Sequence, residues 1–462
     1  MLSFIKDKYQ IHSLQYSQIF FIFIIASLVR FSYIFFFVDG ADLIAEDQSA
    51  YINFAKFLVE NGPSAYLEQN NEMFAERTPV YPFFLMWVYS FIADSNIAVV
   101  YIQAFIDSFT CIIIGLLCKN FVKSGLLSGG LISALNMNMV IISGTILTDT
   151  LFLFFFSLFC LFSIRYIKNL NNYNILLSIL TLSISTLIRP VSYYLVFVVL
   201  FLLIVFYISN RTPIKKSFSG VSIYIVILLV TLGGVHYKNY IAYNSLSYVS
   251  EGGVHALNWV YPASYQYSSQ GTYEEGKKNA NLYLNEAMKR DNISQLPDNP
   301  FSYSQYLMLV AKDALLELGI PNLVQAWTVG TVINLMSPSL AFSPIVRSME
   351  HPSFYMTGGS GIFEKMYNYI SKTGSLSYIS ILFFGTVSSF IFVLATIVGF
   401  FKKIVSEDKT TEDYAILCLL FIVVMYFIVI TGPIIGVKYR LPIEPIMTIF
   451  VAYAINVIKL KW

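Results

Sequence analysis

The sequence predicts an all-α polytopic membrane protein with about ten transmembrane helices. Of its 462 residues, 56% are hydrophobic and only 12% are charged, whereas an average soluble domain carries about 25% charged residues. Apolar runs long enough to cross a hydrocarbon core, about 20 residues each, recur from one end of the chain to the other. The mean hydropathy is +0.66. A water-soluble class is therefore excluded, and no basic patch of the kind that binds nucleic acid is present.

Ten apolar runs are the expected spans. The first follows Lys6 and Lys8, is too long for the apolar region of a signal peptide and has no A-x-A cleavage site, so we expect an uncleaved helix with its N-terminus inside. The expected spans are roughly 17–38, 97–118, 125–143, 149–166, 175–188, 191–208, 218–236, 377–401, 414–431 and 441–458.

Orientation follows from charge. Lysine and arginine gather in the short segments after every second span, which is typical of the cytoplasmic side. Residues 39–80 carry eight acidic and two basic residues, so this segment is expected outside, and the short apolar stretch 80–93 is expected to be a helix that does not cross. The basic residues are Lys119, Lys123, Arg165, Lys168, Arg211, Lys215, Lys216, Lys402, Lys403, Lys459 and Lys461.

This topology divides the chain into three parts. Residues 1–236 form an N-terminal transmembrane catalytic module with a first outer loop at 39–96, residues 237–376 an extracytoplasmic region, and residues 377–462 the last transmembrane helices. The middle region is too long for a mere connection, and its stretch 301–318 is expected to be an amphipathic helix. We expect a multi-pass protein of the cell (inner) membrane whose site faces away from the cytoplasm.

Two motifs stand in the first outer loop. Asp47-x3-Tyr51-x3-Ala55 follows the first span, and Arg77-x-Pro-x-Tyr81-Pro opens the next apolar stretch. Together they resemble the GT-C glycosyltransferases of the protein O-mannosyltransferase and aminoarabinose transferase type. The resemblance covers the first ~210 residues and the final span, and extends to Asp149, Arg189-Pro190 and Arg440-Leu-Pro442.

The resemblance implies an inverting transferase that takes a sugar from a polyprenyl-phosphate donor. Its acceptor would be a lipid-linked glycan, an envelope polymer or a protein. Displacement at the anomeric carbon needs a base for the acceptor's proton, and Asp47 fits this role on the outer side, with Tyr51 one helical turn away. Taken by itself, one acid among eight in a loop is more often a solvated charge.

Asp149 is the second catalytic candidate. It stands at the expected outer mouth of the fourth span and would orient an acceptor or share a divalent metal ion with Asp47. The alternative is a helix N-cap. Neither His236 nor His255 has the spacing of a metal motif, so a hydrogen-bonded loop histidine is the simpler interpretation of each.

Four cations are candidates for the departing phosphate. Arginine at a membrane border is expensive and hence a functional candidate, and its fork matches phosphate oxygens. Pairing with a loop acid or snorkelling is the alternative for each. The expected donor-phosphate and substrate-binding residues are Arg77, Arg189, Lys438 and Arg440, with the motif tyrosines Tyr51 and Tyr81.

Two other functions remain open at this point. A transporter or flippase for lipid-linked sugars would also need outer arginines, but should show charges through the middle of several spans and two matched halves, whereas no internal repeat is visible. A polymerase or ligase for lipid-linked glycans would keep the topology without requiring the Asp47 motif. Arg30, inside the first span, is expected to pair with an acid or hold its helix in place.

Overall fold

The computed structural model describes residues 2–38, 46–67, 73–359, 361–407 and 409–459, and over these ranges it contains helices and no strand. Eight helices are long and apolar enough to cross a membrane. The expected all-α membrane class is therefore confirmed. The eight are α1 (Leu2–Phe37), α5 (Asn96–Lys119), α8 (Asp149–Asn169), α10 (Tyr193–Ser209), α11 (Ile214–Tyr243), α19 (Leu376–Val405), α20 (Thr411–Thr431) and α21 (Glu444–Lys459).

Two further elements account for the difference between the ten expected spans and the eight helices long enough to cross. The expected span 125–143 is a bent pair, α6 (Gly125–Ala134) and α7 (Met137–Ser143), whose axes differ by 54° and which makes a ninth span if counted as one. α9 (Asn172–Ile188) has 17 residues, about 26 Å of helix, and packs beside α8 and α11. The expected ten are reached only by including both.

The bend is built by polar groups buried in the bundle. Arg30 of α1 forms an ion pair with Asp107 of α5 at 2.7 Å, as expected for a charge inside a span. Its guanidinium also donates to the carbonyls of Ala134 (3.1 Å) and Ser133 (3.4 Å). These carbonyls end α6, and a helix broken inside a membrane needs such partners for its freed backbone groups. On the other side of the bend, the Asn136 side chain caps α7.

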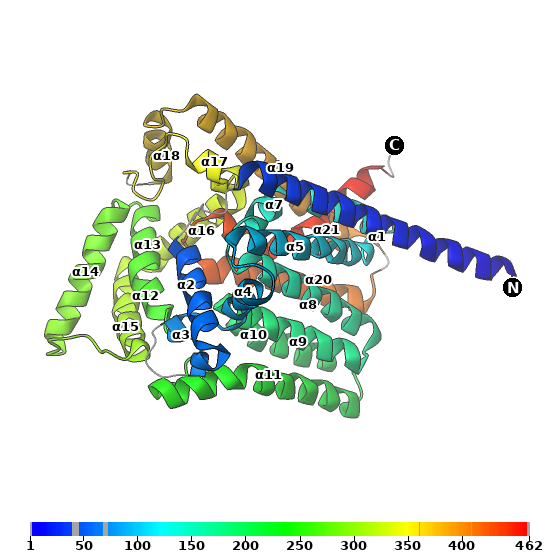
Figure 1. The fold of residues 1–462 in the computed structure, drawn as a ribbon, viewed down its shortest axis with the longest axis horizontal. Coiled ribbons are helices and arrows are strands. Elements are labelled where there is room, and N and C mark those ends of the chain that lie inside the picture. The colour runs from blue at the N-terminus through cyan, green and yellow to red at the C-terminus, as the bar shows by residue number, and fades with distance from the viewer. Residues whose placement is uncertain (1, 39–45, 68–72, 360, 408, 460–462) are drawn as a thin grey trace.

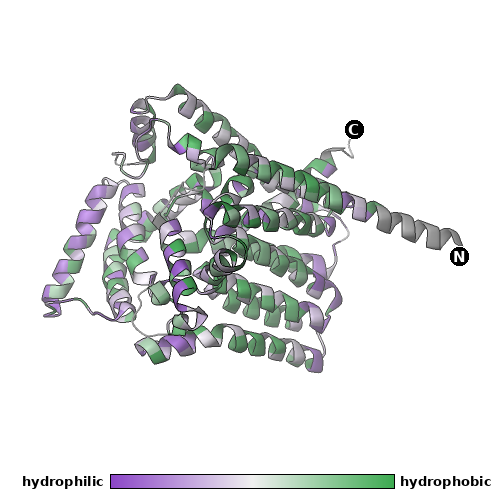
Figure 2. Cartoon of the chain, viewed as in Figure 1, coloured by the Kyte–Doolittle hydropathy of each residue, from purple (hydrophilic) through white to green (hydrophobic). Residues whose placement is uncertain are grey.

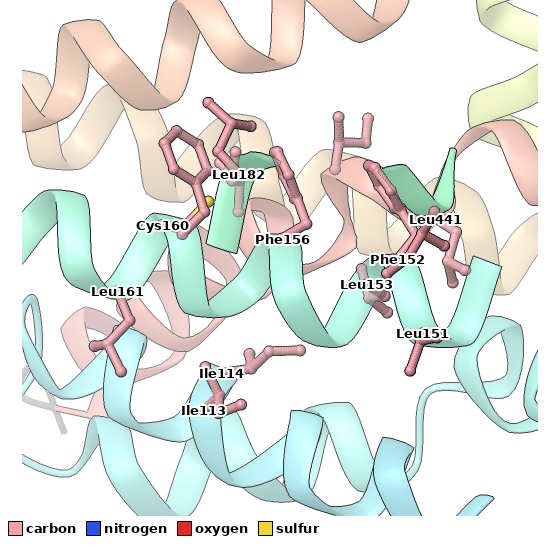
Figure 3. Close-up of a cluster of buried hydrophobic side chains, with 14 of the residues drawn as sticks. Ile113, Ile114, Leu151, Phe152, Leu153, Phe156, Cys160, Leu161, Leu182 and Leu441 are labelled. Carbon is pink, nitrogen blue, oxygen red and sulfur yellow. The ribbon is translucent and has the colours of Figure 1, made fainter. Parts of the chain in front are cut away.

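α8 lies at the centre of the bundle and α19 at its edge. In the apolar 18-residue stretch of α8, 72% of the residues are buried inside the protein, compared with 11% in the corresponding stretch of α19. Figure 3 shows Phe152 and Phe156 of α8 among side chains of α5 and α9. The two rings stack at 5.3 Å, and Phe156 meets Phe427 of α20 edge-on at the same distance. This core fixes the start of α8, where Asp149 stands.

Short helices cover the end of the bundle that the charge pattern predicts to face outside. α2 (Glu46–Asn61), α3 (Met73–Glu76) and α4 (Val80–Phe91) form the first outer loop, and α4 packs against α2 and the end of α9. With 12 residues, or about 18 Å, α4 is too short to cross, which agrees with the expected non-crossing helix.

The region between α11 and α19 is helical and lies at one end of the molecule (Figure 1). Hydrophilic residues dominate α14, in contrast to the spans (Figure 2). The expected helix at 301–318 is present as α15. The elements are α12 (Gly252–His255), a π-helical turn (Ala256–Val260), α13 (Tyr261–Tyr267), α14 (Tyr273–Arg290), α15 (Pro300–Leu318), α16 (Ile320–Met336), α17 (Pro344–Arg347) and α18 (Ile362–Ser371).

Candidate active site

Asp47 lies between two cations at the end of the bundle that α2, α3 and α4 cover. Its carboxylate oxygens are 3.1 Å from Lys438 Nζ and 3.4 Å from an Arg77 guanidinium nitrogen. Asp47 is on the first turns of α2, Arg77 follows α3, and Lys438 is on a 3-10 turn (Val437–Tyr439) that opens the last span. The Asp47 side chain is 40% exposed, about twice as much as either cation, so a ligand can reach this carboxylate.

Arg77 is held by a second acid that comes from the middle region. Glu251, at the start of α12, forms an ion pair with Arg77 at 3.1 Å. The guanidinium carbon also lies 5.3 Å from the centre of the Tyr51 ring, a cation–π distance. The expected motif residues Asp47, Tyr51 and Arg77 thus meet in space.

Arg189 and Asp149 form a buried ion pair beside this group. A guanidinium nitrogen of Arg189 contacts Asp149 Oδ1, and the Asp149 side chain is only 2% exposed. Thr78 Oγ1, next to Arg77, donates to the carbonyl of Ile188 at 2.9 Å, so one hydrogen bond fixes the two arginine-bearing segments relative to each other. Arg189 also acts electrostatically on Asp47 and Lys438.

These residues form a cluster of three cations and three acids, called the outer charged cluster after the side on which the charge pattern of the sequence predicts it: Arg77, Arg189, Lys438, Asp47, Asp149 and Glu251. Partial burial acts to raise the pKa of Asp47, but the charges of Lys438 and Arg77 outweigh it, and the pKa is lowered below its ordinary value. Burial raises the pKa of Glu251, with Arg77 opposing. The Asp47 carboxylate therefore stays ionised to lower pH than the Glu251 carboxylate.

Amide side chains connect the two carboxylate-bearing segments. Gln48, adjacent to Asp47 and buried, accepts a hydrogen bond from the backbone N–H of Ile146 at 2.7 Å. Gln103 of α5 donates to the Thr145 carbonyl at 2.6 Å and accepts from the Tyr81 hydroxyl at 2.7 Å. The loop before Asp149 is thereby tied to α2 and to α4.

Tyr81 is a structural support of the candidate site, because it packs against Tyr51 and bonds to Gln103. It is fully buried, and its ring packs edge-on against Tyr51 at 5.1 Å. Its hydroxyl is occupied by Gln103.

Arg440 lies in a separate buried network. It pairs with Glu444 at 2.7 Å and donates to the Leu335 carbonyl at 2.7 Å. Glu444 also accepts from Asn136 (2.8 Å) and Asn138 (3.2 Å), next to the bend between α6 and α7. Arg440 thus anchors the turn that carries Lys438, and its polar partners among the described residues, Glu444 and the Leu335 carbonyl, lie outside the outer charged cluster.

Among the described residues, no three His, Cys, Asp or Glu side chains gather into a group that suits a metal ion. Asp47 and Asp149 contact cationic side chains instead. His236 bonds to the Leu246 carbonyl, and His255 lies 4.0 Å from Glu251. Both histidines lie on helices, His236 within α11 and His255 at the end of α12, so the expected placement in loops is wrong.

Four residues of this arrangement are absent from the sequence predictions: Gln48, Gln103, Glu251 and Glu444. An amide within an apolar span, such as Gln103, is a signal that was available, because a polar side chain in a membrane needs a partner. Glu251 stands in a region without a recognisable motif, and its pairing with Arg77 depends on tertiary structure.

No protein-family model and no curated protein matches the sequence. Among solved structures, the chain is similar to the crystal structure of ArnT from Cupriavidus metallidurans bound to undecaprenyl phosphate. The match covers 95% of this chain and 77% of that chain, with 10% sequence identity and a TM-score of 0.40. A likeness at this level carries no argument about function.

Proposed function

We propose that the chain is an inverting glycosyltransferase that moves a sugar from a polyprenyl-phosphate donor to an acceptor on the outer face of the cytoplasmic membrane. The observation that carries this is Asp47, an accessible carboxylate held between Lys438 and Arg77 at the end of the helical bundle. A base for the acceptor and cations for a leaving phosphate are the two requirements of the reaction, and here they are adjacent.

The cations are placed to receive the donor phosphate. Lys438 and Arg77 have side chains 22% and 20% exposed, so they retain surface for phosphate oxygens in addition to the carboxylates they contact. Arg189 is fixed by Asp149, which orients its guanidinium and leaves its remaining N–H groups as donors. Charge-assisted hydrogen bonds of this type hold phosphate with defined geometry.

The reaction step uses Asp47 as the base. The acceptor hydroxyl oxygen attacks the anomeric carbon, and the bond between this carbon and the phosphate oxygen breaks. The electron pair leaves with the polyprenyl phosphate, where Lys438, Arg77 and Arg189 stabilise the charge. Asp47 takes the hydroxyl proton as the new bond forms, and the anomeric configuration inverts.

The lowered pKa of Asp47 is compatible with this role. The hydroxyl becomes strongly acidic only when its oxygen has begun to bond to the sugar, so the base accepts a proton late in the step. A carboxylate that remains ionised is then always ready. As the phosphate engages Lys438 and Arg77, those cations stabilise Asp47 less, which increases its basicity at the moment of transfer.

The test is reconstitution of the purified protein in liposomes with polyprenyl-phosphate monosaccharides and candidate acceptors. Mass spectrometry should detect free polyprenyl phosphate and a product one sugar heavier, both dependent on Asp47. Movement of the intact donor across the bilayer without cleavage would instead support a flippase. Transfer of a preformed oligosaccharide in place of one sugar would support a polymerase or ligase.

A further inference from the structure

α18 has an apolar stripe that faces away from the protein. Phe363, Met366, Tyr367 and Ile370 recur at the spacing of one helix face, and their side chains are 87%, 46%, 73% and 46% exposed. The other face packs inward, with Lys365 0% and Tyr369 6% exposed. A contiguous outward apolar face on a short amphipathic helix is typical of a helix that lies in a membrane interface.

The position of α18 in the chain places it at the lipid border. α18 ends at Ser371 and the span α19 begins at Leu376. Counting back about 20 residues of hydrocarbon from the basic pair Lys402–Lys403 reaches about residue 382. Leu376 then lies about 9 Å farther along the helix, in the headgroup layer. This argument holds whichever side of the membrane α19 begins on.

The beginning of α19 also has an exposed apolar surface, next in the chain to the apolar stripe of α18. Leu376, Phe383 and Phe384 of that span are 77%, 63% and 70% exposed, as expected for side chains that face lipid. α18 and the beginning of α19 lie at the same corner of the molecule (Figure 1). One lipid surface can therefore cover both.

We propose that α18 is an interfacial helix whose apolar face is embedded in the lipid leaflet at the outer end of the bundle. The partner is the apolar part of the leaflet, because the exposed stripe is apolar and Lys365, the one lysine within α18, points inward. Zwitterionic lipid should suffice, and salt should not release the helix.

Hydrogen bonds connect α18 to the segment that carries Lys438 of the outer charged cluster. Lys365 Nζ donates to Gln266 Oε1 at 2.8 Å and to the Tyr355 carbonyl at 3.2 Å. The Tyr355 hydroxyl donates to the carbonyl of Ile435, three residues before Lys438. The lipid-embedded helix thus holds the segment that packs against the Lys438 turn.

The experiment uses the full chain, with Cys418→Ser to remove the exposed native thiol, in phosphatidylcholine liposomes. The environment-sensitive fluorophore NBD is attached at Phe363→Cys and, as a second site on the same face, at Tyr367→Cys. Lys289→Cys on the hydrophilic α14 is the water-exposed control, and Phe384→Cys on α19 is the lipid-facing control. Fluorescence is quenched from the lipid by doxyl-labelled phosphatidylcholine and from water by iodide.

Both α18 labels should show blue-shifted emission, quenching by doxyl lipid and loss of iodide quenching, close to Phe384→Cys and unlike Lys289→Cys. Raising the salt concentration should change none of these. Iodide quenching as strong as at Lys289→Cys, without doxyl quenching, would place the face in water and overturn the proposal. Protection from both quenchers, together with disulfide cross-links between two Phe363→Cys chains that carry no label, would show that a second copy covers this face and would equally overturn the proposal.

Discussion

Lys438 Nζ and Asp47 Oδ2 are 3.1 Å apart although 391 residues separate them in the chain. The contact joins the turn that opens the last span to the helix that follows the first span. It brings a cation to Asp47, the accessible carboxylate that we propose as the base. Segments from near both ends of the chain therefore contribute to the outer charged cluster.

The Arg189–Asp149 pair should govern use of the donor. Arg189→Lys keeps the charge but loses the fork, so we expect the donor KM to rise about 10- to 150-fold, corresponding to the ~1.5–3 kcal/mol of a charge-assisted hydrogen bond. Steady-state kinetics over a range of donor concentrations measures this. Arg165→Lys, an exposed arginine on α8 far from Asp149 in the helix, is the control and should leave the donor KM unchanged.

Arg189→Ala is a poorer test of the phosphate, because it leaves Asp149 buried without its partner, a change that destabilises by about 3–5 kcal/mol. The double variant Arg189→Ala with Asp149→Asn removes that problem because no buried charge is left unpaired, and its effect should be smaller than the sum of the two single effects because the residues are in contact. A wild-type donor KM in Arg189→Lys would remove Arg189 from phosphate binding.

Much of the site was predictable, because chemistry-bearing residues in an apolar chain are few. Asp47, Tyr51, Arg77, Asp149, Arg189 and Lys438 were expected from motif and membrane border, and the structure brings all six together. Hydropathy located the eight candidate spans, the bent pair α6 and α7, and the short apolar helices α4 and α9. The bend between α6 and α7 was missed, because it depends on the contact of Arg30 with the Ala134 carbonyl, 104 residues away in the chain.

The roles of Arg440 and Tyr81 illustrate what sequence could not supply. Arg440 stands at a membrane border like Arg189, yet Glu444, one helical turn later, pairs with it at 2.7 Å. Tyr81 belongs to the same motif as Arg77, but its hydroxyl bonds to Gln103 inside the bundle. Position in a motif does not determine which way a side chain points; the partners available in the fold decide it.

Because of Lys365, the free energy of unfolding should change with pH in the alkaline range. Burial lowers its pKa from 10.5 to about 8, so between about pH 8 and 10.5 the unfolded state binds more protons than the folded state. Stability therefore rises with pH across that window. Thermal unfolding in detergent should show a Tm increment between pH 8 and 10 that is absent in Lys365→Met. Lys289→Met, on exposed α14, should retain the increment, and an identical pH dependence in Lys365→Met would contradict the burial of this charge.

The outer charged cluster requires that the middle region face outside. In intact cells carrying Cys418→Ser, a membrane-impermeant maleimide should label Lys289→Cys on α14 and should label Lys216→Cys at the start of α11 only after permeabilisation. Both positions are exposed, so reactivity reports the side of the membrane. The reverse pattern would place the cluster in the cytoplasm and rule out transfer on the outer face.

A lost base should lower turnover and leave the fold intact. Asp47→Asn keeps the size of the side chain but cannot take a proton, so the rate of sugar transfer should fall by about 10²–10⁴. Glu60→Gln, at the exposed far end of α2, is a matched change on the same helix and should retain wild-type turnover.

The most direct measurement is the single-turnover rate of sugar transfer at saturating donor in wild type, Asp47→Asn and Glu60→Gln. The proposed mechanism predicts a loss of at least about 100-fold confined to Asp47→Asn, with donor binding no weaker than in the wild type because Lys438 and Arg77 remain. Full transfer activity in Asp47→Asn would contradict it, because the carboxylate between Lys438 and Arg77 would then not be the base.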